Sequence, residues 1–276
     1  MSFKRVTKLN PCPICRQAGL RGIDWCRIFA DGWIECMRVQ SDRPAKSGGW
    51  MHSQRELSPG PSREPCRFVP PPPIINATKL HRDWLAATTP VALAVFAQEL
   101  GLSVAALKAT GAAWAAPHAS WAFPMCDGYG NTLGIRLRAN DGRKFAVRGS
   151  KQGIFIAKVP PQPTLFVCEG PTDTAAAVEL GLFAVGRPNC CCGGADIKIF
   201  ARRHQCHRVV VVSDNDKPGL DGARKVGAEI GLPFAVYVPP AKDLREFVRL
   251  GGTRTMIENT LNNTVWHQHS KPITNP

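Results

Sequence analysis

Two short apolar runs, each closed by acidic residues, organise this sequence: Thr164-Leu165-Phe166-Val167-Cys168-Glu169 and Arg208-Val209-Val210-Val211-Val212-Ser213-Asp214-Asn215-Asp216. Both runs are rich in β-branched or aromatic residues and end in turn formers, which predicts strands buried on both faces. Carboxylates gathered at the carboxyl ends of parallel strands are how an α/β sheet holds a hard divalent cation over a phosphate.

The segments around these two runs predict an alternating α/β order. Helices are expected at 173–180, capped by Thr172 and stopped by Gly181, and at 220–230, after a break at Pro218-Gly219. A strand at 182–185, a helix at 195–204 and a strand at 233–238 complete the pattern. This β-α-β-α-β-α-β order predicts a mostly parallel sheet with right-handed crossovers.

Three carboxylates, those of Glu169, Asp214 and Asp216, are expected to converge on one crevice, because ligands of such sheets bind outside the carboxyl ends of the strands. The spacing of Asp214 and Asp216 places two side chains on one side of a turn. The alternative is that each acidic residue only caps the helix that follows it.

The two acidic segments resemble the signature motifs of the Toprim domain, which bacterial-type primases, type IA and II topoisomerases and certain nucleases share. The segments are Glu169-Gly170-Pro171-Thr172-Asp173 and Ser213-Asp214-Asn215-Asp216-Lys217-Pro218-Gly219, and the resemblance covers about residues 160–262. It implies that Glu169, Asp214 and Asp216 are catalytic and bind Mg²⁺ or Mn²⁺, with Glu169 also a candidate proton relay. Asp243 corresponds to a third acidic element, but Arg245 stands where primases usually have another carboxylate, which puts a second metal position in doubt.

Four cysteines near the amino terminus predict a structural Zn²⁺ site. Cys12 and Cys15 form a knuckle, and Cys26 and Cys36 would face one another across a hairpin that turns at Asp31-Gly32. His52 is an alternative fourth ligand, and reduced cysteines packed as small hydrophobic side chains are the alternative to a metal site. Residues 1–52 resemble the zinc ribbons ahead of Toprim domains in phage and plasmid primases; the ribbon's tryptophans would either stack on unpaired bases or form its small core: Trp25, Trp33, Trp50.

The chain between the zinc ribbon and the Toprim segment divides into a spacer and a basic subdomain. Residues 53–78 are rich in proline and predict a semi-rigid polyproline II linker. Residues 79–158 predict two or three short helices and then strands near 121–125, 134–138, 144–148 and 153–156. Basic side chains on these strands form a strip that, with a lysine after Asp216, is expected to bind nucleic acid or nucleotide: Arg136, Arg138, Lys144, Arg148, Lys151, Lys217. The strip resembles the template-gripping and nucleotide-gripping subdomain of primases; a solvated sheet face is the alternative.

Composition favours a polyanionic partner. The 276 residues carry a net charge of +14 with a pI near 9.6, and the excess falls on residues 1–78 (+6) and 79–158 (+6) more than on 159–276 (+2). Eleven cysteines, an odd number, without an apolar signal segment favour a reducing cytoplasm, with Cys190-Cys191-Cys192 in a buried turn. No apolar stretch approaches the ~18 residues of a membrane span.

The expected fold is an α/β Toprim domain with a mostly parallel sheet at 159–262, preceded by the zinc ribbon and the small α+β basic subdomain and followed by a tail at 263–276. The expected function is a Mg²⁺-dependent DNA primase that makes short RNA primers from nucleoside triphosphates on single-stranded DNA for a phage, plasmid or other mobile element. The alternatives are a Toprim nuclease and a non-catalytic DNA-binding factor. A topoisomerase would need a gate domain, for which the chain has no room, and a separate helicase is the expected partner because no P-loop motif occurs.

Overall fold

The structure is a computed structural model that describes residues 3–7, 10–17, 26–45, 49–53, 75–189 and 192–268. The chain divides into two compact units, Met1–Pro71 and Pro72–Pro276. Residues 54–74 of the expected spacer lie outside the described residues, as do Trp25, Cys190, Cys191 and residues 269–276 of the expected tail.

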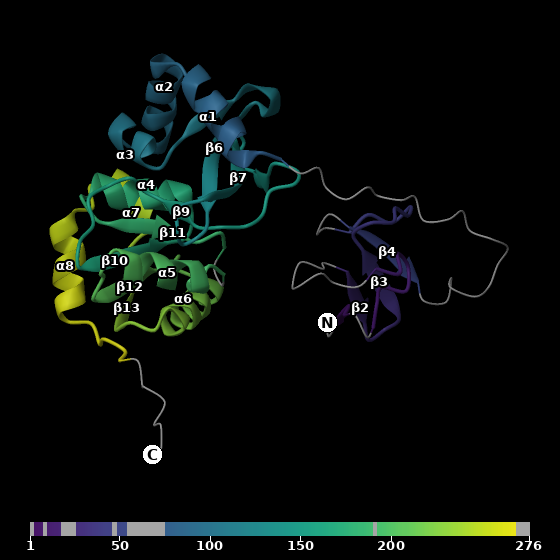
Figure 1. Cartoon of the computed structure of the whole chain (residues 1–276). Helices are drawn as coiled ribbons and strands as arrows, with labels where there is room; N and C mark the ends of the chain where they lie inside the picture. Colours follow the sequence, from purple (N-terminus) through teal and green to yellow (C-terminus); the bar gives the residue numbers. More distant parts are fainter. Residues whose placement is uncertain are drawn as a thin grey trace. The chain divides into compact units, whose positions relative to one another are not determined.

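The smaller unit contains a four-stranded antiparallel sheet in the order β1-β2-β3-β4 (Figure 1). Its strands are β1 (Phe3–Arg5), β2 (Arg27–Phe29), β3 (Trp33–Cys36) and β4 (Trp50–Ser53). The predicted turn at Asp31-Gly32 joins β2 to β3: the Asp31 side chain accepts a hydrogen bond from the Trp33 amide, and Gly32 has a φ of 86°. The small core of this unit contains the four cysteines with Val6 and Ile34, whereas Trp33 and Trp50 are half-buried and lie outside it.

The larger unit opens with three helices packed on a second antiparallel sheet. The helices are α1 (Ala77–Ala87), α2 (Pro90–Leu100) and α3 (Val104–Ala109), which agrees with the expected number. The sheet has the order β5-β6-β7-β8, with β5 (Ala113–Ala115), β6 (Ser120–Cys126), β7 (Thr132–Ala139) and β8 (Lys144–Ala146), and a 3-10 turn at Ala116–His118 joins β5 to β6.

The predicted α/β sheet forms the rest of this unit, in the order β13-β12-β10-β11-β9. Its parallel strands are β10 (Thr164–Cys168), β11 (Ala184–Gly186), β12 (Arg208–Val212) and β13 (Phe234–Tyr237), and the edge strand β9 (Phe155–Ile156) is antiparallel. The helices are α4 (Pro171–Glu179), α5 (Gly194–Arg203), α6 (Lys217–Ile230), α7 (Leu244–Arg249) and α8 (Arg254–Asn262).

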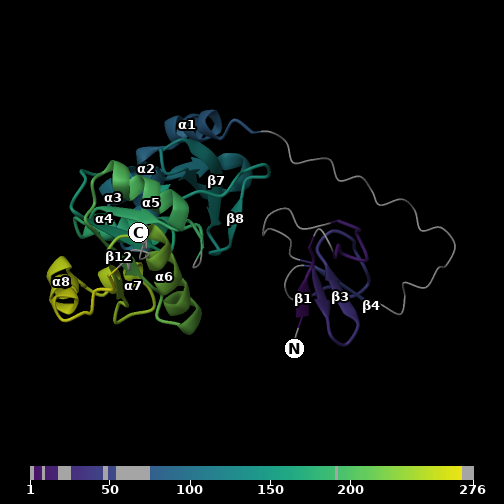
Figure 2. The same cartoon turned by 60° about the horizontal axis from the view of Figure 1, so that its bottom comes forward.

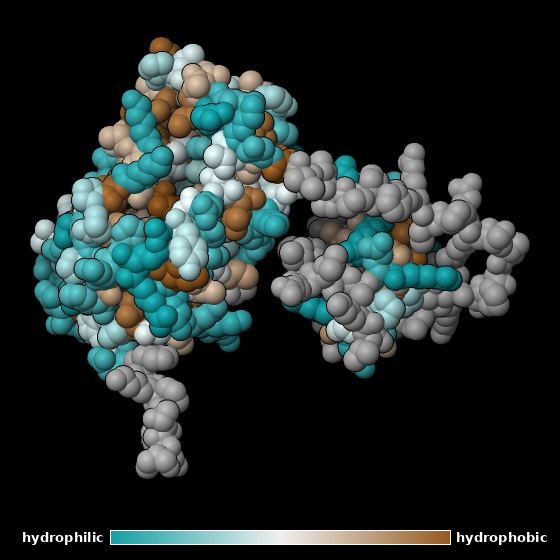
Figure 3. Space-filling view, viewed as in Figure 1, coloured by the Kyte–Doolittle hydropathy of each residue, from teal (hydrophilic) through white to brown (hydrophobic). Residues whose placement is uncertain are grey.

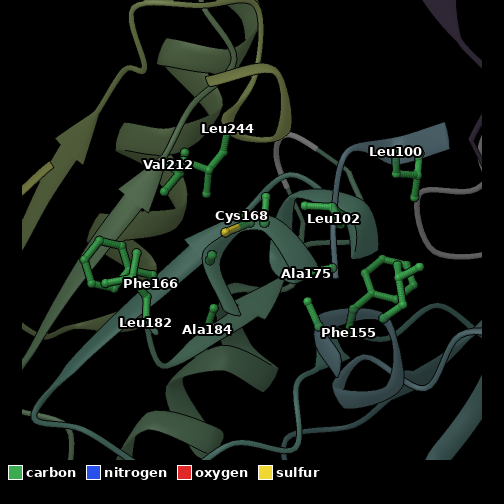
Figure 4. Close-up of a cluster of buried hydrophobic side chains, with 14 of the residues drawn as sticks. Leu100, Leu102, Phe155, Phe166, Cys168, Ala175, Leu182, Ala184, Val212 and Leu244 are labelled. Carbon is green, nitrogen blue, oxygen red and sulfur yellow. The ribbon is translucent and has the colours of Figure 1, made fainter. Parts of the chain in front are cut away.

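Helices cover both faces of this sheet, and the central strands β10 and β12 are buried and apolar after their first residue, as the sequence predicted. In Figure 1, α4 and α7 lie on one side of the strands and α5 and α6 on the other. Alternate side chains enter the two layers: Phe166 and Cys168 of β10 pack with α4 and α7, while Leu165 and Val167 pack with α5 and α6. Figure 4 shows part of the first layer, including Cys168, Ala175, Val212 and Leu244.

The starts of two helices differ from the expectation. Thr172 does not cap α4: the cap position is Gly170, with a φ of 146°, and Thr172 is buried in the first turn. Similarly, Pro218 does not break the chain, because α6 already begins at Lys217. In both helices proline lies in the first turn, where its missing N–H would have had no intrahelical partner.

One strand expected in the basic stretch pairs elsewhere. Phe155 and Ile156 form β9, which pairs with β11 at the edge of the α/β sheet. The preceding residue, Ile154, exchanges backbone hydrogen bonds with Cys126 of β6. Residues 154–156 therefore link the two sheets of the larger unit.

The surface of the larger unit is mostly polar. On the face shown in Figure 3, hydrophilic residues predominate, with hydrophobic residues interspersed, including some around α1 and α2 at the top. Among the described helices, none has the length and apolar content needed to cross a membrane.

Candidate active site and zinc site

The parallel pairing of β10 with β12 positions the first acidic residues. Thr164 pairs with Arg208 and Val167 with Val211, so the two strands end at the same edge of the sheet. Glu169 follows β10 directly and Asp214 follows β12 after one residue. The structure therefore brings Glu169 and Asp214 to one edge, as expected.

The environment of Asp214 shows that several carboxylates converge on it. Burial, and then the negative charges of Glu169, Asp243 and Asp216, raise the pKa of Asp214 to about 6, and Lys144 opposes this shift. Both burial and the neighbouring negative charges disfavour the ionised form of Asp214, and a cation bound among these groups would offset that cost. The arrangement thus has the electrostatics of a cation site.

Asp216 and Asp243 each cap a helix. Helix capping was the alternative to cation binding for acidic residues that follow strands. The Oδ1 atom of Asp216 accepts a hydrogen bond of 2.7 Å from the Gly219 amide, and Oδ1 of Asp243 accepts one of 2.7 Å from the Glu246 amide. Capping uses one oxygen of each carboxylate, so it is compatible with a second role for the other oxygen. Oδ2 of Asp243 lies 3.7 Å from a guanidinium nitrogen of Arg245.

Asp173 is a member of the acidic cluster that the sequence reasoning did not assign to the site. It lies in the first turn of α4, is only 7% exposed, and accepts a hydrogen bond of 3.2 Å from the Arg245 amide. Burial, followed by the charges of Asp243 and Asp214, raises its pKa to about 6. Asp173 belongs to the quoted acidic motif, and its spacing of one helical turn from Glu169 was the available signal.

Arg187 is the second residue that was missed. Its side chain is fully buried and donates a hydrogen bond of 2.7 Å to Oε1 of Glu169 and one of 3.1 Å to the carbonyl oxygen of Val212. A buried guanidinium requires such partners. Its only signal in the sequence was a charged residue immediately after an apolar strand.

The carboxylates supply only some of the ligands that a Mg²⁺ ion needs. Among the described residues, no group of three or more carboxylates brings its oxygens as close together as the four cysteine sulfurs of the smaller unit. Mg²⁺ keeps several waters and also binds substrate phosphates, so one or two protein carboxylates suffice. Glu169, Asp216 and Asp243 each have one oxygen engaged, so each retains one oxygen for such an ion. Glu169 and Asp214 are the two that follow the paired strands β10 and β12.

Basic side chains from the second sheet face Glu169. Arg136, Arg138 and Lys144 line a small pocket together with Glu169 and the first turn of α4. Arg138 pairs with Lys144 across β7 and β8, and the nearby carboxylates of Asp173 and Asp243 offset the repulsion between the two cations. Half of the predicted basic strip therefore borders the acidic edge.

The other three predicted basic residues lie apart from this pocket. Arg148 and Lys151 are exposed after β8, and Lys217 is exposed at the first position of α6. None of the three is among the residues that line the pocket.

The four predicted zinc ligands meet at one point. The sulfurs of Cys12, Cys15, Cys26 and Cys36 all lie within 4.8 Å of one another, and all four residues are buried. Such spacing fits a tetrahedral Zn²⁺ ion with Zn–S bonds of about 2.3 Å. His52 lies outside this group: its Nε2 is 3.0 Å from the carbonyl oxygen of Val39.

Backbone amides and one guanidinium surround the sulfurs. The Met37 amide donates to Cys26 Sγ and the Val39 amide to Cys36 Sγ, at 3.5 and 3.4 Å, and Arg38 lies 3.6 Å from Cys15 Sγ. These donors stabilise thiolates, which are the form that binds zinc.

Comparison with known proteins identifies the fold. No family model and no curated protein matches the sequence. The structure is nevertheless similar to the catalytic domain of DnaG primase bound to single-stranded DNA, with a TM-score of 0.54 and 16% identity over 69% of this chain and 78% of that chain. It is also similar to the Escherichia coli primase catalytic core, with a TM-score of 0.55 and 16% identity over 69% of this chain and 79% of that chain.

A longer similarity includes the amino-terminal unit. The zinc-binding and RNA polymerase domains of Aquifex aeolicus primase match with a TM-score of 0.54 and 10% identity, over 90% of this chain and 77% of that chain. At such low identity the likeness defines the fold alone. The protein therefore has the Toprim fold of primase catalytic cores, preceded by a zinc-ribbon unit with a Cys₄ cluster.

The zinc site predicts distinct metal contents for three variants. Cys26→Ser should lose most of the bound zinc, of which we expect about one ion per chain, because three thiolates hold the ion less tightly than four. His52→Gln should keep its zinc, and so should Cys126→Ser, which replaces a buried cysteine outside the cluster. Elemental analysis of the purified proteins tests this; zinc loss in His52→Gln equal to that in Cys26→Ser would contradict the assignment.

The raised pKa of Asp214 predicts a pH-dependent gain in stability on neutralising it. Between pH values near 3.8 and 6 the native state binds this proton more tightly than the unfolded chain does, so stability falls as the pH rises. Asp214→Asn removes this penalty and should stabilise the larger unit by about 1–3 kcal/mol above pH 6, with no gain below pH 4.

Thermal unfolding of the two proteins across this pH range measures the difference. Added Mg²⁺ should raise the melting temperature of the wild type more than that of Asp214→Asn, because a ligand stabilises only the form that binds it. Equal responses of both proteins to Mg²⁺, or a difference independent of pH, would show that Asp214 is not part of a cation site.

Proposed function

We propose that this protein is a DNA primase of the bacterial and phage type, a nucleotidyltransferase that makes short RNA primers on single-stranded DNA. The observation that carries the proposal is the convergence of Glu169 and Asp214, at the ends of paired parallel strands, opposite the basic side chains of Arg136, Arg138 and Lys144. The similarity to primase catalytic cores supports it.

Carboxylates and cations serve different parts of this reaction. Joining two nucleotides requires attack of a hydroxyl on the α-phosphorus of a nucleoside triphosphate and departure of pyrophosphate. Mg²⁺, or Mn²⁺ in its place, would neutralise the charge on the phosphate oxygens. Glu169 and Asp214 would hold this ion, while Asp216 and Asp243 would complete the acidic edge.

Arg187 fixes Glu169 as a ligand. The ion pair engages Oε1 of Glu169, and Oε2 would be the oxygen that binds the cation. A carboxylate fixed in this way is suited to binding a cation, and Glu169 would also be the candidate to accept the proton of the attacking hydroxyl.

The basic pocket would bind the phosphates of the nucleotide or template. Arg136 is half-buried and donates a hydrogen bond of 3.3 Å to the carbonyl oxygen of Pro188, so its guanidinium has a fixed position. Arg148, Lys151 and Lys217, being exposed, would contact the nucleic acid backbone further from the chemistry. The zinc ribbon would position the template, with Trp33 and Trp50 available for stacking.

The proposal extends to the setting of the enzyme. A primase of this kind would work in the cytoplasm with a separate replicative helicase, on a phage, plasmid or other mobile element. The chain's net charge of +14 supports a polyanionic partner.

One assay tests catalysis. The protein is incubated with Mg²⁺, a single-stranded DNA template and labelled ribonucleoside triphosphates, and we expect template-dependent oligomers. Asp214→Ala should reduce their yield by about 100-fold or more, because it removes a cation ligand. Asp221→Ala, which replaces an exposed acidic residue of α6, should leave the yield unchanged.

The other outcomes identify the alternatives. A shortened template that Asp214→Ala leaves intact would indicate a Toprim nuclease. Neither product, with DNA binding retained, would favour a non-catalytic DNA-binding factor. The ion pair between Asp243 and Arg245 is the observation that favours a non-catalytic DNA-binding factor.

We further propose that Arg245 takes the place of a second metal ion. Its guanidinium lies 3.7 Å from Asp243 Oδ2, its amide binds Asp173, and it lies close to Arg138. A permanent cation there neutralises the same carboxylates that a second ion would bind. The site would thus hold one divalent ion and one guanidinium.

Arg245→Gln should therefore bind more Mn²⁺ per chain than the wild type. Electron paramagnetic resonance of free Mn²⁺ during a titration measures the number bound. The matched control is Arg249→Gln on the same helix, which removes an exposed partner of Glu246 and should bind as the wild type does. Identical titration curves for all three proteins would show that Arg245 does not exclude a second ion.

A further inference from the structure

The turn between β6 and β7 presents an aromatic ring to solvent. Tyr129 is 61% exposed, although burying a tyrosine ring is normally favourable. Asp127 orders the turn: its Oδ1 accepts hydrogen bonds of 2.9 Å from the amides of Tyr129 and Asn131, and its Oδ2 accepts one from the Asn131 side chain. Tyr129 is therefore held outward by a defined turn.

The same turn is attached to α5. The Gly128 amide donates to Oδ1 of Asp196 at 3.0 Å, and Arg203 donates to the carbonyl oxygens of Gly128 and Tyr129 at 3.3 and 2.8 Å. A Cβ atom at position 128 would lie 2.5 Å from the Asp196 carbonyl oxygen, so only glycine permits this approach. The position of the ring is thus fixed relative to α5.

Arg203 also supports the ring itself. Its guanidinium carbon lies 5.4 Å from the centre of the Tyr129 ring, within the range of a cation–π contact. One face of the ring meets a positive charge, and the exposure of the residue leaves ring surface for a planar ligand. An aromatic ring beside arginine is a surface on which nucleic acid bases stack.

The adjacent surface of α5 is basic. Lys198 and Arg202 are four residues apart, so they lie on one face of the helix, about 100° around the helix axis from the row that carries Arg203. Among the described residues, neither has an acidic side chain within ion-pair distance. The one acidic residue of α5, Asp196, is used to hold the Gly128 amide.

We propose that Tyr129, Arg203, Lys198 and Arg202 form a second contact surface for single-stranded DNA, separate from the carboxylate site. We call it the α5 platform. Tyr129 would stack on a base, and Lys198 and Arg202 would contact phosphates of neighbouring nucleotides. This inference rests on the proposed nucleic acid substrate but not on catalysis.

The direction of α5 places its last turn away from the acidic edge of the sheet. The helix begins after the carboxyl end of β11 and returns toward the start of β12, with α5 and α6 brought forward in Figure 2. Arg203, its last residue, is about 14 Å along the helix axis from Gly194 at a rise of about 1.5 Å per residue.

Binding of fluorescent oligothymidylate, measured by anisotropy at several salt concentrations, tests the platform in the full-length protein. Tyr129→Ala should weaken binding by about 5- to 20-fold with an unchanged salt dependence, because stacking involves no counterion release. Lys198→Ala with Arg202→Ala should instead flatten the logarithmic salt slope by about 1.4, the value for two phosphates of a single strand.

Two controls separate stacking from other effects. Tyr129→Phe should bind as the wild type does, since the phenyl ring stacks equally well. Val91→Ala, which changes an exposed apolar residue of α2, should also have no effect. Unchanged affinity of Tyr129→Ala, or a slope unaffected by the double substitution, would overturn the proposal.

A second measurement uses the wild-type protein, so its result does not depend on whether Tyr129→Ala loosens the turn. An oligonucleotide containing 5-iododeoxyuridine is irradiated on the wild-type protein, and the cross-linked peptide is identified by mass spectrometry. Cross-links to Tyr129 support the platform, and cross-links confined to other aromatic residues contradict it. Because neither experiment requires primer synthesis, failure of the platform and failure of the proposed catalysis give different results.

Discussion

The fully buried side chain of Arg187 holds together the acidic edge of the sheet, where the strands that precede Glu169 and Asp214 end. Arg187 follows β11, its amide donates to the carbonyl oxygen of Cys168 at the end of β10, and its guanidinium reaches Glu169 and the last residue of β12, Val212. One residue thus connects the carboxyl ends of three adjacent strands. Removing one partner of such a buried ion pair typically costs about 3–5 kcal/mol, because the remaining charge is stranded in the interior.

The acidic edge depends on this connection. Without a fixed Glu169, its carboxylate and that of Asp214 would move apart, because their charges repel. The neighbouring cations reduce the same repulsion from the other side: Lys144 acts on Asp214 and Asp173, and Arg245 on Asp243. The site is therefore an arrangement of opposing charges that the protein holds in place before any ligand binds.

Glycine and proline placement could be read only partly from the sequence. Glycine at 181 and 231 ends helices, as expected, because both positions adopt a positive φ. The starts of α4 and α6 were displaced by one or more residues, since proline was taken as a break rather than as a first-turn residue. The edge strand β9 was grouped with the strands of the basic subdomain, whereas it pairs with β11, because two residues carry too little pattern to specify a pairing partner.

What the sequence by itself determined is the set of elements and the residues at their ends. Apolar strands followed by Glu169 and Asp214, and cysteines spaced around a hairpin, are local patterns, and local patterns suffice for a parallel sheet and for a Cys₄ cluster. Only the tertiary structure decided how the charges are shared: that Asp173 joins the acidic group and that Arg187 and Arg245 pair with Glu169 and Asp243. These pairings join residues on different strands and helices. A charge needs a partner when it is buried, and burial is a property of the packed chain rather than of any one segment.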